Sequence, residues 1–238
     1  YFIYFYIIIY KMDSLLGNDV VNSRAVKSSF YITYVFFLTT ATITFIEAMR
    51  TKDIRIRNIL NLETCISVVA AFFYKMFTDK VEKGEMNYKE INVTRYTDWA
   101  ITTPIMLLVL CLAFLYNSKA GSLNFFKFLM ILVLNYGMLG TGYLGETGQL
   151  EKPIANIVGF GFFFLLYFYI HQLFLKGRKN SDNSMLFWAF AILWAMYGVF
   201  YQVDPVPRNV GYNVLDLFSK CFVGIFFWAY FTKTFKLK

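Results

Sequence analysis

The sequence contains few of the residues from which most soluble active sites are built. Among 238 residues there are one histidine, three cysteines and four prolines, and only 16% of residues are charged. It has no Cys-x-x-Cys pair, Cys/His cluster, Walker loop, G-x-S-x-G or H-E-x-x-H motif. We therefore expect no metal site, disulfide framework or enzymatic activity.

Hydrophobic residues, in contrast, make up 58% of the chain, and the mean hydropathy is +0.50. Seven apolar stretches are each about 20 residues long, enough for a helix to cross a hydrocarbon core of about 30 Å. Lone strands cannot satisfy their backbone groups in lipid, so these stretches predict an all-α membrane protein, a bundle of seven transmembrane helices. They are Ser28 to Met49, Asn58 to Thr78, Val93 to Tyr116, Leu123 to Leu144, Pro153 to Leu175, Ser184 to Val203 and Val210 to Thr232.

Lysine and arginine gather in alternate connections, which predicts how the chain is oriented. By the positive-inside rule, the N-terminus is expected outside and the C-terminus in the cytoplasm. The net charge of +8 is then explained by basic residues that flank the spans and lie beside anionic lipid. No nucleic-acid partner is expected. The basic residues on the predicted cytoplasmic side are Arg50, Lys52, Arg55, Arg57, Lys119, Lys176, Arg178, Lys179, Lys233, Lys236 and Lys238.

Residues 1–25 precede the first predicted span and are expected to form an N-terminal extension, with the seven-helix domain over residues 26–238. The apolar run Tyr1 to Lys11 is only about 15 Å long as a helix, too short to cross a membrane. It also lacks the charged start and the cleavage site of a secretory signal. We hypothesise that residues 1–11 are not native and that Met12 is the natural start; an interfacial role is the alternative.

One lysine lies in the middle of the seventh apolar stretch. An ammonium group there must be neutralised or meet a fixed anion, because an unpaired charge in hydrocarbon costs several kcal/mol. Asp216 lies four residues before Lys220, one helical turn away on the same face. The pair is typical of a functional amine with its counter-ion.

A second polar cluster begins the third span. Arg95, Asp98 and Thr102 share one helix face, so the arginine and the hydroxyl can keep the carboxylate ionised. Pro104 removes a backbone bond and can kink the helix just inside the cluster. The alternative is a snorkelling arginine beside a satisfied aspartate. Together with Lys220, the functional interpretation is favoured.

The segment RYTDWAITTP (95–104), together with LDLFSK (215–220), resembles the microbial (type 1) rhodopsins, seven-helix proteins that carry all-trans retinal as a protonated Schiff base on the last helix. The resemblance covers most of the chain. It implies that Lys220 carries retinal, that Asp98 is the primary counter-ion and Asp216 the second, and that Arg95 modulates both. Further residues implied around the retinal are Trp99, Thr102, Thr103, Met138, Gly142, Trp194 and Tyr197, with Tyr74 in the second span.

The chain departs from the pattern of outward proton pumps. Val109 stands eleven residues beyond Asp98, where pumps place a carboxylate that returns the proton, and an apolar side chain cannot donate one. Near the opposite exit, Asp204 with Arg208 offers no evident glutamate pair. Asn135 replaces a frequent carboxylic acid, and Gly198 follows Tyr197 where a proline is usual. Fast vectorial pumping is therefore disfavoured.

Polar residues remain where an ion pathway would need them. Glu63 is the most informative, because a second-span carboxylate is not needed to hold retinal but can attract cations.

These features also resemble the group 1 viral rhodopsins of algal giant viruses, which implies a light-gated cation channel in the plasma membrane or another membrane of an infected host cell. Alternatives are a slow outward proton pump and a sensory receptor. Expected partners are membrane lipid, cations or protons, and further copies of the chain. The predicted pathway residues are Arg95, Asp98, Glu63, Tyr74, Ser29 and Asn213.

Overall fold

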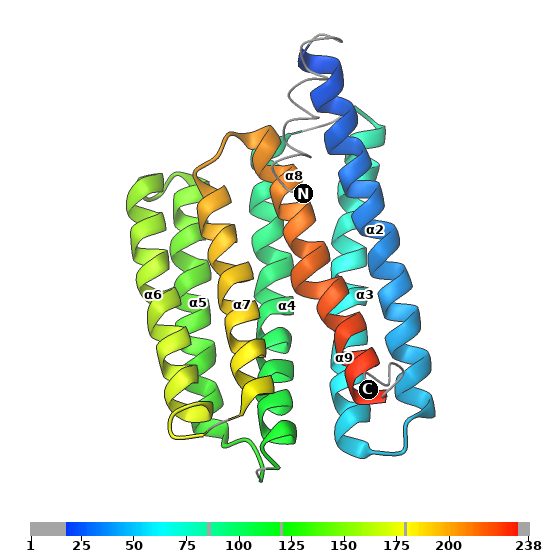
Figure 1. Ribbon diagram of the computed structural model, residues 1–238. Coiled ribbons are helices and arrows are strands. Elements are labelled where there is room, and N and C mark those ends of the chain that lie inside the picture. Colours follow the sequence, from blue (N-terminus) through cyan, green and yellow to red (C-terminus); the bar gives the residue numbers. More distant parts are fainter. Residues whose placement is uncertain (1–17, 85–86, 120, 179, 233–238) are drawn as a thin grey trace.

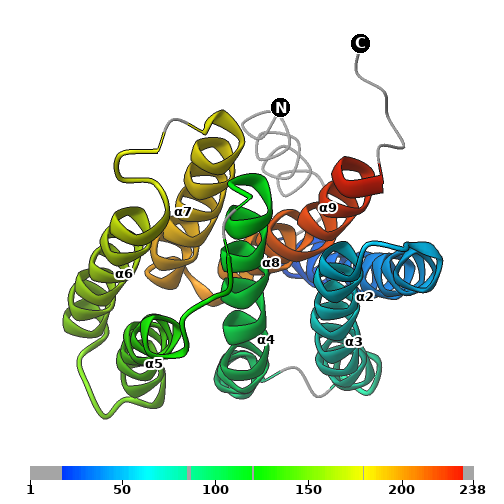
Figure 2. The same cartoon turned by 90° about the horizontal axis from the view of Figure 1, so that it is seen from below.

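The computed structural model describes residues 18–84, 87–119, 121–178 and 180–232, and this part of the chain is helical without strands (Figure 1). The helices run alternately up and down. Helix α4 and the last membrane segment, which consists of α8, η1 and α9, lie between α2 and α3 on one side and α5 to α7 on the other (Figure 2). They are α2 (Asn18–Arg50), α3 (Ile54–Glu82), α4 (Tyr88–Asn117), α5 (Phe125–Thr147), α6 (Lys152–Phe174), α7 (Ser181–Tyr201), α8 (Pro205–Asp216), the π-helical η1 (Leu217–Phe222) and α9 (Val223–Thr232).

Seven helical segments in the described part are long and apolar enough to cross a membrane, which confirms the predicted seven-helix fold. Six of them begin earlier than predicted, most clearly the first and the last. The last starts at Pro205 because prolines need no helical N–H in a first turn. The first extends back to Asn18, so the boundary expected at residue 25 lies within α2, and the domain division stays a prediction. The hypothesis about residues 1–11 lies outside the described residues.

The helix ends follow from local sequence. Side chains of Asp53, Asn87, Asn124 and Asn180 accept bonds from the first free N–H groups of α3, α4, α5 and α7. The N–H of Arg55 holds the pKa of Asp53 below its usual range. Gly148 ends α5 with φ of +82°, a conformation that glycine adopts without strain. These caps explain why the connections are short.

Pro104 lies inside α4 and has no N–H for the carbonyl of Ala100. The hydroxyl of Tyr136 on α5 donates to that carbonyl at 3.0 Å. The backbone group that the proline leaves free is therefore satisfied from the neighbouring helix, which fixes α5 against the part of α4 that carries Asp98.

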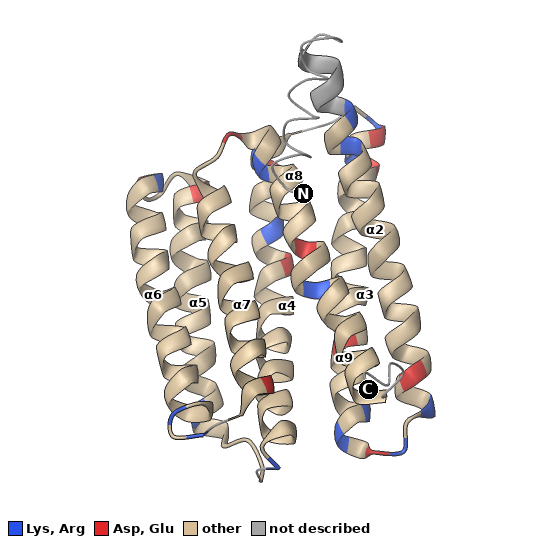
Figure 3. Cartoon of the chain, viewed as in Figure 1, with Lys and Arg blue, Asp and Glu red and all other residues tan. Residues whose placement is uncertain are grey.

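The two ends of the bundle differ in charge. We call the end at which α4 and α8 begin the upper end, and the opposite one the lower end, as they stand in Figure 1. Lysine and arginine gather in the lower connections, whereas both signs are mixed at the upper end (Figure 3). This pattern supports the predicted orientation, which stays a prediction. The tail lysines Lys233, Lys236 and Lys238 and the loop residue Lys179 lie outside the described residues.

Candidate functional site

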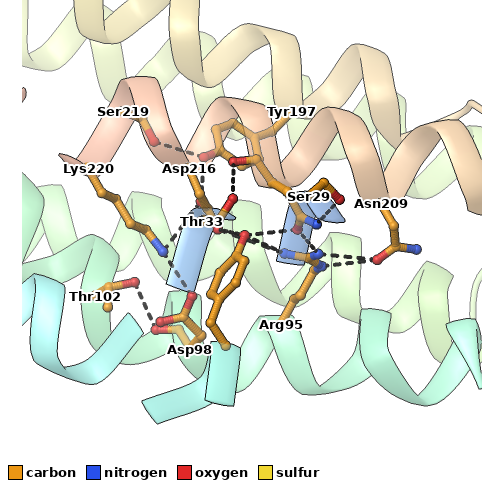
Figure 4. Close-up of polar contacts among 12 residues, drawn as sticks. Ser29, Thr33, Arg95, Asp98, Thr102, Tyr197, Asn209, Asp216, Ser219 and Lys220 are labelled. Atoms are coloured by element: carbon orange, nitrogen blue, oxygen red, sulfur yellow. Dashed lines mark hydrogen bonds and ion pairs between the residues drawn. The ribbon is translucent and has the colours of Figure 1, made fainter. Parts of the chain in front are cut away.

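The site is centred on Lys220, which lies in the π-helical turn between α8 and α9 and is 2% exposed. Its Nζ donates to Oδ2 of Asp98 on α4 at 2.8 Å, and Oδ1 of Asp216 lies 3.5 Å away (Figure 4). The predicted meeting of one amine with carboxylates from two helices is therefore present. A π-turn is a local departure from α geometry that frequently marks functional positions, and here it carries the lysine.

Asp216 is held from several sides. Tyr74 on α3 donates to its Oδ2 at 2.8 Å, and Tyr197 on α7 donates to its Oδ1 at 2.6 Å. Arg95 on α4 forms an ion pair with it at 3.8 Å. Because its partners come from three different helices, this carboxylate has a fixed position and a compensated charge.

Asp98 has a different environment, and one sequence-based expectation about it is wrong. The Thr102 hydroxyl donates to the main-chain carbonyl of Asp98 at 2.9 Å, and not to its carboxylate, because a helical threonine reaches the carbonyl four residues back. Arg95 pairs with Asp216 instead of Asp98. Asp98 Oδ1 is buried without a partner among the described residues. This carboxylate therefore retains a free acceptor atom beside the amine.

Arg95 is the centre of a polar network between the carboxylates and the upper end. It is 1% exposed and donates to Tyr74, Asn209 and Asn213. Asn213 in turn donates to Ser29 on α2 at 2.8 Å. The structure therefore brings together four predicted pathway residues, Arg95, Tyr74, Asn213 and Ser29, from four helical segments.

A cavity beside Lys220 and a second cavity next to it share Trp99 and Trp194 as lining residues. The first is also lined by Thr103, Met106, Tyr197, Ser219 and Lys220, and the second by Met138, Gly142, Phe160 and Gly198, among others. A Cβ at Gly142 would come within 2.6 Å of the Tyr96 hydroxyl, so glycine keeps this end open. The narrow, largely aromatic space that starts at the amine fits an elongated apolar group such as retinal.

The remaining predicted positions lie outside this pocket. Val109 is fully buried in the apolar core of the lower half. Asn135 donates to the Thr103 hydroxyl at 2.9 Å and so joins α5 to α4. Glu63 on α3 is 2% exposed, and its Oε2 has no partner among the described residues. It lies eleven residues before Tyr74, about 16 Å along the helix toward the lower end.

A buried ion pair at the upper end was not predicted from the sequence. Arg208 on α8 pairs with Glu146 on α5 at 3.1 Å. Asn92 and Asn209, also missed, lie between this pair and Arg95. The residues are far apart along the chain, and the only signal in the sequence was a glutamate and an arginine at the ends of apolar stretches.

Comparison with known proteins gives consistent matches. A sequence profile described as "Bacteriorhodopsin-like protein" matches residues 24–234. The solved structure of viral rhodopsin OLPVRII is 57% identical, covers 89% of this chain and 99% of its own, and superposes with a TM-score of 0.84. A green-light absorbing proteorhodopsin from gamma-proteobacterium EBAC31A08 is 25% identical over 236 residues, with 89% of this chain and 88% of its own covered. Blue light-absorbing proteorhodopsin from Med12, 22% identical with a TM-score of 0.70 over 88% of this chain and 97% of its own, shares the fold.

Proposed function

Because the chain belongs to the bacteriorhodopsin-like family of microbial rhodopsins, we propose that it is a light-gated cation channel with retinal on Lys220. Members of this family are multi-pass membrane photoreceptors and light-driven ion transporters, not enzymes, and bind retinal through a Schiff base to a lysine. Among the described residues, Lys220 is the one lysine that is almost fully buried. It is therefore the lysine that we assign to retinal.

The residues around Lys220 have separate tasks in this proposal. Retinal, when bound, supplies light absorption and isomerisation. Asp98 and Asp216 balance a positive charge on the lysine nitrogen, and Arg95 compensates the second carboxylate. Trp99 and Trp194 line the space next to the amine and exclude water from it. Asp98, which has a free oxygen, is the carboxylate best placed to accept a proton from the lysine nitrogen.

The observation that carries the channel proposal is a polar seam between α2, α3, α4 and the last membrane segment. Above Lys220 it contains Ser29, Asn213 and Arg95, which are joined by hydrogen bonds. Below Lys220 it contains Glu63 and Ser67, one turn apart on α3, each with a buried oxygen lacking a partner among the described residues.

The lower part of the seam is packed closely against α9. A Cβ at Gly224 would lie 3.0 Å from Glu63 Oε2 and 3.0 Å from Cγ2 of Thr40 on α2, so a glycine lets the three segments pack closely where they meet. A small shift of α9 would therefore open or close the space beside the Glu63 carboxyl group. Buried carboxyl and hydroxyl groups without fixed partners are suited to replace part of the hydration shell of a passing cation.

The corresponding path along α4 is apolar. Val109 is fully buried among residues such as Leu107 and Leu110 and offers no group that could return a proton to the lysine nitrogen. This argues against fast pumping. The 2.8 Å contact between Lys220 and Asp98 nevertheless supports a second candidate, a slow outward proton pump, because the first proton transfer needs only that contact.

Whole-cell voltage clamp under illumination tests the proposal. We expect a photocurrent that changes sign with voltage and whose reversal potential follows the cation gradient. A photocurrent of one direction at all voltages would instead support the pump, and its absence in cells that contain the pigment would support a sensory role. Lys220→Ala is the control, because it removes the attachment point and should abolish both colour and current.

A further inference from the structure

We propose that Glu146 and Arg208 form a latch that closes the upper end of the ion path, and that Asn92 and Asn209 couple this latch to Arg95. The inference deepens the proposed channel function and rests on it. Together the five residues connect α4, α5 and α8 at the end of the bundle opposite to Glu63.

The latch is a buried ion pair between the end of α5 and the start of α8. The side chains of Arg208 and Glu146 are 5% and 7% exposed, and Nη1 of the arginine lies 3.1 Å from Oε2 of the glutamate. Arg208 Nη1 also lies 3.4 Å from the carbonyl oxygen of Tyr201, the last residue of α7. The pair therefore joins the ends of three helices, α5, α7 and α8.

A chain of hydrogen bonds connects the latch to the site. Arg95 Nη2 donates to Asn209 Oδ1 at 3.2 Å, and Asn209 Nδ2 donates to Asn92 Oδ1 at 3.3 Å. Asn92 Nδ2 then donates to Glu146 Oε1 at 3.0 Å. Each hydrogen bond is donated in the direction from Arg95 toward Glu146. The two asparagine amides therefore each have a single orientation, because a flipped amide would place two donors or two acceptors against each other.

This series of hydrogen bonds can transmit a displacement of side chains, but it cannot conduct a proton. Asparagine amides do not titrate in the physiological range, and both are buried, Asn92 at 3% and Asn209 at 0% exposure. Arg95, at the other end, pairs with Asp216, which in turn lies 3.5 Å from Lys220. A displacement at Lys220 that moves Arg95 therefore shifts Asn209 and Asn92 and withdraws one of the two donors of Glu146.

The same geometry explains how the latch would act on cations. In the resting pair, the positive charge of Arg208 neutralises Glu146, so the carboxylate does not attract a cation at the upper end. When the pair separates, the carboxylate becomes available to an entering cation. Glu146 then contributes to the ion selectivity of the channel, whereas Asn92 affects only the rate at which the channel closes.

Two variants and a matched control test these separate roles in the full-length pigment. Glu146→Gln removes the charge of the latch, and Asn92→Leu cuts the chain but leaves the ion pair intact. Glu151→Gln is the control, because Glu151 lies at the same end, is exposed, and makes no side-chain capping bond. The measurements are the closing rate after light, the reversal potential in a cation gradient, and the transient absorption of the purified pigment.

Both variants are expected to slow closing, by roughly 2-fold to 30-fold, as for other couplings between sites. Only Glu146→Gln should shift the reversal potential. The double variant Glu146→Gln/Asn92→Leu should close no more slowly than the slower of the two single variants, because both substitutions act on the same hydrogen-bonded unit. If Glu146→Gln does not form pigment, Asn92→Leu alone decides the coupling. Closing rates in both variants equal to those of Glu151→Gln would overturn the proposal.

Failure of the channel proposal can be recognised separately. If the unmodified protein gives no reversing photocurrent, the channel function is wrong, but the return of the dark absorption spectrum still reports the coupling. The chain of hydrogen bonds predicts that this recovery changes in Asn92→Leu and not in Glu151→Gln. An identical recovery in all three proteins would refute the coupling itself.

Discussion

At the scale of single residues, the two aspartates near Lys220 are not equivalent. Asp216 accepts bonds from two tyrosines and pairs with Arg95, whereas Asp98 contacts the amine directly and keeps one oxygen without a partner among the described residues. Removing the charge of Asp98 should therefore disturb the Lys220 amine more than removing the charge of Asp216, because Asp98 lies closer to the amine.

For Asp98→Asn we expect a red-shifted absorption maximum and slowed or lost deprotonation of the lysine nitrogen after light. The anion that stabilises the positive charge in the dark state is then absent. Steady-state and flash spectroscopy of the purified pigment measure both effects. Asp79→Asn, which changes an exposed carboxylate paired with Lys75, should leave the spectrum as it is. An unshifted maximum in Asp98→Asn would contradict its role as counter-ion.

Glu63 provides a second prediction at this scale. Glu63→Gln keeps the shape of the side chain but removes its ability to carry a negative charge, so we expect a smaller photocurrent and a shifted reversal potential with an unchanged spectrum. Glu47→Gln is a suitable control, because Glu47 lies at the lower end of α2 and pairs with the exposed Arg50. Conductance and selectivity equal to those of the unmodified protein would remove Glu63 from the pathway.

At the scale of helices, glycines determine how closely the upper ends pack. A Cβ at Gly145 would lie 2.2 Å from the Tyr201 hydroxyl and 2.5 Å from the Ala155 Cβ, whereas one at Gly140, on the same helix, would meet nothing within 4 Å. The two positions differ in packing alone, which allows a direct comparison.

Gly145→Ala should destabilise the protein by about 1–3 kcal/mol, the usual cost of overpacking. Gly140→Ala should be neutral or stabilise it by up to about 1 kcal/mol, because alanine has the higher helix propensity. Thermal bleaching of the retinal pigment compares the two variants. Equal bleaching temperatures would show that α5, α6 and α7 do not pack as closely at this end as the structure indicates.

The same scale shows what the sequence could and could not predict. Length and hydropathy predicted the seven spans, and helical spacing placed Asp216 one turn from Lys220. Spacing also put Arg95 and Asp98 on one face of α4 but could not tell which aspartate the arginine pairs with, because that depends on how α4 packs against α8. For the same reason Glu146 and Arg208, on different helices, could not be matched from sequence.

At the scale of the whole molecule, the unequal charge of the two ends predicts orientation. Lysine and arginine in the lower connections should remain in the cytoplasm. An epitope tag at the N-terminus is therefore expected to be accessible in intact cells, and one at the C-terminus only after permeabilisation. Detection of both tags in permeabilised cells controls for expression. The reverse accessibility would show that the orientation is inverted.

Self-association also belongs to this scale and stays a prediction. Many apolar side chains on α2, α5 and α6 are exposed, including Phe45, Val133 and Phe164. Lipid and a second copy of the chain can both cover such faces, so exposure alone does not select between them. Chemical cross-linking in lipid nanodiscs would decide whether the protein is an oligomer.

The π-helical turn at Leu217–Phe222 limits how the length of this chain can change during evolution. One more residue inserted into that turn would rotate the preceding part of the helix by about 100° relative to the part that follows, because the π-turn already contains one residue more than α geometry allows. The bonds from Tyr74 and Tyr197 to Asp216 would then be lost together. Homologous genes should therefore retain the lysine in this turn and carry no insertion there.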